Sequence, residues 1–186
     1  MKTLIQGARL LNPADGTDQQ ADIAIAAGRI IAVGQMPTDF VPQRTLDASG
    51  CYVLPGLVDL AVRLREPGQE HARMLESEMH AAVAGGVTSL VCPPDTDPVL
   101  DESGLVEMLR FRAARLRQAR VFPLGALTRQ LKGEVLTEML ELTESGCVGC
   151  SQADITIRNT QVLQRAPPDA STVGDRQCQL EAWREN

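Results

Sequence analysis

The stretch PGLVDLAVRLREPG, residues 55–68, carries the pattern that decides the fold. At the two-residue period of a β-strand, one face is apolar and is formed by Val58, Leu60, Val62 and Leu64. The other face carries Asp59, Ala61, Arg63 and Arg65. A buried parallel strand is normally apolar on both faces. The charged face therefore indicates a strand whose polar side chains line the opening of a barrel. A half-exposed edge strand fits the same periodicity equally well.

Strand and helix patterns alternate on the C-terminal side of Pro55. Strand-like runs lie at 57–64, 89–92, 121–124 and 147–150, and helical patterns lie at about 71–84, 103–118 and 136–143. This alternation predicts βαβ units and a parallel sheet. Only three to four units fit before residue 165, whereas a closed (β/α)8 barrel takes about 250 residues. We therefore expect about half a barrel.

The two ends of the chain differ from this middle part. Residues 1–54 alternate apolar runs, such as 3–6 and 9–11, with turn signals, which predicts antiparallel strands and hairpins. Residues 55–165 are expected to form the first half of the barrel. Because prolines 167 and 168 interrupt a helical pattern, residues 166–186 are expected to be an irregular tail.

Composition narrows the class of function. The formal charge of −6 and the aromatic content of 3% argue against nucleic-acid binding. No apolar run has the length of a signal peptide or a membrane span, so we expect a cytoplasmic protein without membrane contact. One basic cluster stands out: Arg110, Arg112, Arg115, Arg117 and Arg120. These cations are expected to complement the negative end of a helix macrodipole, the alternative being an anion or partner site.

The cysteines do not form a disulfide pattern, because there are five of them at irregular spacing. Cys147 and Cys150 are the only close pair. A zinc site would need a second ligand pair and a redox motif would need its own fold context, so a structural role is favoured over either function.

Two longer runs resemble the dihydroorotases of the amidohydrolase superfamily. They are PGLVDLAVRLREPGQE at 55–70 and AAVAGGVTSLVCPPDTDPV at 81–99, and the preceding strands followed by Pro55-Gly56 match as well. The resemblance implies an α/β fold, a partial (β/α)8 amidohydrolase barrel preceded by a small N-terminal β-sandwich segment.

The resemblance also implies that the metal ligands have been replaced. The family's first barrel strand ends in Asp-x-His-x-His, whose histidines hold zinc, and these positions are Ala61 and Arg63 here. Alanine has no donor atom, and a guanidinium has no lone pair and repels a dication. Where related enzymes carry a metal-binding acid, this chain has Gln152 and Ala153, and the neighbouring Asp154 is displaced by a residue or two.

No substitute for this metal site is visible. The two histidines, His71 and His80, fall in one expected helix but not on one stripe, so shared metal binding is not expected. Without zinc nothing lowers the pKa of water toward 7, and no Gly-x-Ser-x-Gly nucleophile motif is present. We therefore expect no cofactor, and hypothesise that Arg63, paired with Asp59, supplies the charge of the missing metals.

Two substrate positions can be matched to the family. Arg65 matches the arginine that holds the substrate carboxylate, a task that suits a guanidinium fork. The family's Asn-Thr-x-Pro is Asp95-Thr96-Asp97-Pro98 here, and the carboxylate of Asp95 is expected to repel an anionic substrate. A relic or structural role is favoured for both residues.

These features predict a noncatalytic dihydroorotase-like protein. Such homologues accompany aspartate carbamoyltransferase and support its assembly in pyrimidine biosynthesis, so the catalytic chain of that enzyme is the expected partner. The alternative is an active zinc-dependent dihydroorotase or related cyclic amidohydrolase. A half barrel would expose an apolar face and a strand edge, so we also expect an aggregation-prone or partner-dependent chain, from a truncated or frame-shifted gene.

Overall fold

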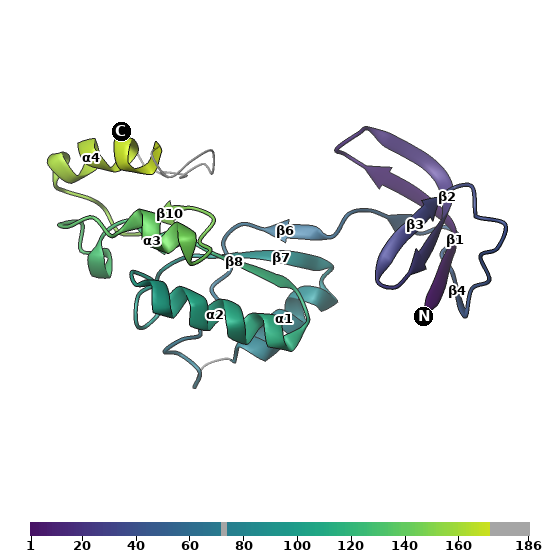
Figure 1. Cartoon of the computed structure of the whole chain (residues 1–186), viewed down its shortest axis with the longest axis horizontal. Coiled ribbons are helices and arrows are strands. Elements are labelled where there is room, and N and C mark those ends of the chain that lie inside the picture. The colour runs from purple at the N-terminus through teal and green to yellow at the C-terminus, as the bar shows by residue number, and fades with distance from the viewer. Residues whose placement is uncertain (72–73, 172–186) are drawn as a thin grey trace. The chain divides into compact units, whose positions relative to one another are not determined.

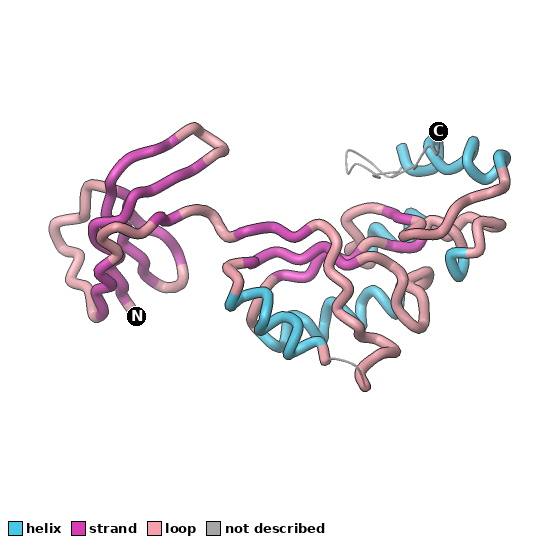
Figure 2. Tube along the Cα trace, turned by 180° about the vertical axis from the view of Figure 1, so that it is seen from behind, coloured by secondary structure: helices cyan, strands magenta, loops and turns pink. Residues whose placement is uncertain are grey.

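The structure is a computed structural model that describes residues 1–71 and 74–171 (Figures 1 and 2). The chain divides after Pro55 into two compact units. The first unit is a β-sheet, and the second combines parallel strands with helices.

The first unit is a five-stranded sheet in the order β3-β2-β1-β4, with β5 also paired to β1. Its strands are β1 (Lys2–Asn12), β2 (Thr17–Ala26), β3 (Arg29–Val33), β4 (Arg44–Asp47) and β5 (Tyr52–Val53). The strands β1, β2 and β3 are antiparallel, as expected, but β4 and β5 run parallel to β1. The runs 3–6 and 9–11 are one strand rather than two, because a register shift between Ile5 and Ala8 absorbs Gly7 at φ +76°.

The second unit contains the predicted parallel sheet. Strands β6 (Leu57–Asp59), β7 (Val87–Cys92) and β8 (Arg120–Pro123) pair in parallel in that order. Directly after β8, β9 (Gly125–Ala126) pairs in parallel with β10 (Cys150–Ser151). Four consecutive strand positions of a (β/α) barrel are thus present, which confirms the predicted α/β fold with a partial barrel.

Helices connect these strands. They are α1 (Leu75–Ala84), α2 (Ser103–Leu116), α3 (Met139–Glu144) and α4 (Thr160–Ser171), with a short 3-10 turn at Arg129–Leu131. Figure 1 shows α1 and α2 together on one side of the sheet formed by β6, β7 and β8. The apolar cluster between them is built from Leu64, Met79, Leu90, Val106 and Leu109, all at most 2% exposed.

The expected strand over 57–64 is too long, because β6 ends at Asp59. The Asp59 carboxylate accepts a hydrogen bond from the Ala61 backbone N–H at 3.0 Å, a local turn that competes with strand pairing. Beyond it, Leu64 is fully buried, and Arg65 has a φ of +62°. The strict alternation of two faces therefore does not continue to Arg65.

Other boundaries also need correction. The helix expected from residue 71 begins at Leu75, and the strand expected over 147–150 is reduced to Cys150–Ser151. Helix α4 continues past Pro167 and Pro168 to Ser171, so the expected irregular structure is wrong for residues 166–171. Each proline removes one backbone donor, and a helix can continue where its other hydrogen bonds remain. The rest of the expected tail, 172–186, lies outside the described residues.

Candidate functional site

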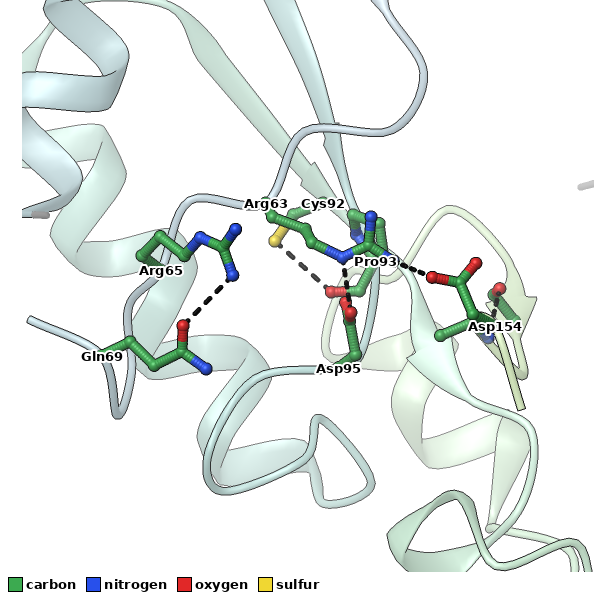
Figure 3. Close-up of polar contacts among 9 residues, drawn as sticks. Arg63, Arg65, Gln69, Cys92, Pro93, Asp95 and Asp154 are labelled. Carbon is green, nitrogen blue, oxygen red and sulfur yellow. Dashed lines mark hydrogen bonds and ion pairs between the residues drawn. The ribbon is translucent and has the colours of Figure 1, made fainter. Parts of the chain in front are cut away.

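Three charged side chains meet where the parallel strands end (Figure 3). Arg63 lies in the loop after β6, Asp95 follows β7, and Asp154 follows β10. Because the carboxyl ends of parallel strands lie at one edge of the sheet, residues distant in sequence meet there, and α/β proteins place their sites at this edge. This edge is the candidate functional site.

Arg63 is the centre of the cluster. Its Nε donates to Asp95 Oδ2 at 2.6 Å, and its Nη2 donates to Asp154 Oδ2 at 2.5 Å. The side chains of Arg63 and Asp95 are 37% and 27% exposed, whereas that of Asp154 is 86% exposed, so Asp95 is the less screened partner. The hydrogen bond to Asp95, followed by the charge of Asp95, raises the pKa of Arg63 above its usual value.

The expected pairing of Arg63 with Asp59 is wrong. The Asp59 carboxylate turns back to the Ala61 N–H instead. Asp154, for which no role was expected, reaches Arg63 because the chain bends at Ala153, which has a φ of +50°. The Ala153 N–H donates to Ser151 Oγ at 3.0 Å and fixes this bend. A left-handed alanine has no sequence signal, so the approach of Asp154 could not be predicted.

The residues at this edge do not fit a zinc ion. Ala61 offers no ligand atom, and the Arg63 guanidinium already contacts both carboxylates that face it. The Gln152 amide is also engaged, since its Oε1 accepts from Thr128 Oγ1 at 2.9 Å and its Nε2 donates to the Leu131 carbonyl at 2.8 Å. Within residues 1–71 and 74–171, no three His, Cys, Asp or Glu side chains are grouped to hold a metal.

The two histidines do not share one helix. His80 is exposed on α1, and His71 is exposed and precedes that helix, so placing both in one helix is wrong. Helix α1 begins at Leu75, whose N–H is bound by the carboxylate of Glu66 at 3.0 Å.

Arg65 is placed differently from Arg63. It is exposed, and its Nη1 donates to Gln69 Oε1 at 3.2 Å. Both arginines line one small pocket together with Gln69, Asp95 and Thr96. The Asp95 carboxylate is already bound by Arg63, so its charge is partly compensated within the pocket. The relic or structural role favoured for Arg65 therefore stays a prediction, and weak carboxylate binding stays its alternative.

An ion pair that involves a buried carboxylate was missed by the sequence analysis. Glu66 is only 2% exposed, accepts from the Leu75 N–H at 3.0 Å, and forms an ion pair with Arg112 of α2. This carboxylate caps the start of α1 and joins it to α2. Nothing in the sequence pairs Glu66 with Arg112, because only the packing of the two helices brings them together.

The basic cluster on α2 does not act as one group. Arg115 alone of the five lies in the last helical turn, while Arg112 pairs with Glu66 and Arg110 donates to the Ser145 carbonyl at 2.6 Å. Arg117 is the left-handed C-cap, and Arg120 begins β8. The expected role in complementing the helix macrodipole therefore fits Arg115 and Arg117, at the end of α2, and not the other three arginines.

The close cysteine pair is split between two apolar clusters. Cys147 packs with Leu142 in the large cluster, and Cys150 packs with Leu127 and Met139 in a smaller one. Burial raises the pKa of Cys147 to about 12 and that of Cys92 to about 11. Such thiols are poorly ionised at neutral pH and suit a structural role.

Residues 50–174 match the model of a protein family described as dihydro-orotase-like. The chain belongs to the dihydroorotase-like family. It is 45% identical over 172 residues to a dihydroorotase-like protein of Pseudomonas aeruginosa, and 42% identical over 166 residues to a dihydroorotase of Pelobacter propionicus. These alignments cover 92% and 89% of this chain but only 41% and 39% of the relatives, so this chain spans about two fifths of their length.

Solved structures give the same fold. The L-hydantoinase of Arthrobacter aurescens superposes with a TM-score of 0.67 at 25% identity, covering 80% of this chain and 32% of that enzyme. A crystal structure of a dihydroorotase superposes with a TM-score of 0.60 at 16% identity, covering 92% and 48%. This dihydroorotase-like chain thus corresponds to part of a longer barrel. None of its described helices has the length and apolar character needed to cross a membrane.

Proposed function

We propose that this dihydroorotase-like chain is noncatalytic and acts as a structural subunit for the catalytic chain of aspartate carbamoyltransferase. The observation that carries the proposal is the pair of hydrogen bonds from Arg63 to Asp95 and Asp154. In this arrangement a fixed organic cation connects the strand ends, where a hydrolase of this family would need an open metal position.

The electrostatics support this assignment. A guanidinium stays protonated at every physiological pH, so it cannot deprotonate water or coordinate a metal. Its two carboxylate partners satisfy its charge, and they join the loops that follow β6, β7 and β10. The residues at the strand ends thus favour a rigid scaffold over hydrolysis.

The partner can be tested by co-expression. The full chain, tagged, is expressed with the aspartate carbamoyltransferase catalytic chain of the same organism, and the complex is followed by size-exclusion chromatography with light scattering. We expect the two chains to co-elute, and the transferase to assemble less completely without this chain. Separate elution, with normal assembly of the transferase alone, would refute the structural role.

The absence of catalysis is tested independently. The purified chain, alone and in the complex, is assayed for interconversion of dihydroorotate and carbamoyl-aspartate with added zinc, and its metal content is measured. We expect no turnover and less than stoichiometric zinc. Turnover that a chelator abolishes would establish the alternative, a zinc-dependent dihydroorotase.

A further inference from the structure

A second hollow lies away from the strand ends, between the C-terminal half of α2 and strand β8. Its volume is about 320 Å³, which is within the usual range for small-molecule pockets. Its polar lining consists of Arg110, Arg117, Gln118 and Arg120, and an apolar part is contributed by Val121 and Phe122. The hollow therefore combines cations with an apolar wall.

The charge of this hollow is unbalanced. It is lined by three arginines and no acidic residue, although the whole chain carries a formal charge of −6. Arg110 is held by the Ser145 carbonyl, whereas neither Arg117 nor Arg120 forms an ion pair with any residue in the described part of the chain. The end of α2 contributes only about half a negative charge, so the net field in the hollow favours an anion.

We propose that this hollow binds a small molecule that carries a carboxylate or phosphate beside an apolar part. The anionic group is bound by Arg117 and Arg120, whose guanidinium forks suit either oxyanion. The apolar part of the ligand lies against Val121 and Phe122. This site is separate from the strand ends, and its existence does not depend on the proposed structural role.

The anion requirement is tested by titrating the full chain with inorganic phosphate and with succinate in a calorimeter, at constant ionic strength set by chloride. We expect saturable binding of at least one probe, weakened at least tenfold in the double variant Arg117→Gln/Arg120→Gln. The control Arg29→Gln/Arg44→Gln removes the same charge from exposed positions in the first unit and should bind like the wild type. Absence of binding, or equal weakening in both variants, would overturn the proposal.

Discussion

The charged side chains at the strand ends depart from the family pattern, whereas the apolar layer beneath them keeps what the fold needs. Leu64 is fully buried and packs in one cluster with Leu90 and Leu109, which is the layer any (β/α) barrel needs. Arg63, the residue directly before it, lies among charges at the position where the family resemblance places a zinc ligand. Packing can thus keep a fold while the chemistry at the strand ends is replaced, because the two tasks fall on adjacent side chains.

The largest loss of stability is expected from a substitution in the apolar layer. Replacing Leu64 with alanine leaves a cavity in a fully buried site and should lower the free energy of unfolding by about 3 kcal/mol. Leu60, which is 67% exposed in the same stretch, is the matched control, and Leu60→Ala should cost less than about 0.5 kcal/mol. Urea unfolding of the full chain measures both. Equal losses would mean that Leu64 is not part of a packed layer.

The buried thiols in the same apolar layer should make the free energy of unfolding fall at alkaline pH. Unfolded cysteines ionise near pH 8.5, whereas burial raises the pKa of Cys92 to about 11 and of Cys147 to about 12. Above pH 9 the unfolded state loses protons that the folded state keeps, so stability falls as pH rises, by about 1 kcal/mol per thiol between pH 9 and 10. Urea unfolding across this range should show a shallower decline in Cys92→Ala/Cys147→Ala. An unchanged slope would contradict the assignment.

A smaller effect is expected at the strand ends. Replacing Arg63 with methionine removes both ion pairs and should lower the free energy of unfolding by about 1 kcal/mol, since the groups are partly screened by solvent. Arg65→Met removes the same charge but only one bond to a neutral amide, and should be nearly neutral. The difference should shrink in 1 M salt. If Arg65→Met is the more damaging change, Arg63 does not connect the strand ends.

The smallest effect should be on catalysis. Restoring both histidines in Ala61→His/Arg63→His supplies two ligands, but Gln152 and Ala153 provide no carboxylate. We therefore expect no measurable turnover of dihydroorotate in the presence of zinc. Metal-dependent turnover in this variant would contradict this expectation, because it would mean that other side chains complete the metal site.

The sequence by itself determined the fold class and the parallel pairing of the strands after Pro55. Both follow from local patterns, namely period-two and helical apolar spacing. The replacement of metal ligands at Ala61 and Arg63 is implied by the family resemblance and stays a prediction. The sequence also predicted the alternation of strands and helices, although several element boundaries differ in the structure. Strand β6 stops at Asp59 because a side-chain hydrogen bond competes with the sheet, which periodicity does not report.

Only the tertiary structure decided which charges meet. Arg63 pairs with Asp95 and Asp154 rather than with Asp59, and Glu66, in the loop before α1, pairs with Arg112 of α2. These contacts join loops and helices distant in sequence, and they depend on backbone turns such as that at Ala153. Hydrophobic periodicity records which face of an element is buried, whereas an ion pair depends on where another element places its partner, and that placement exists only in the folded chain.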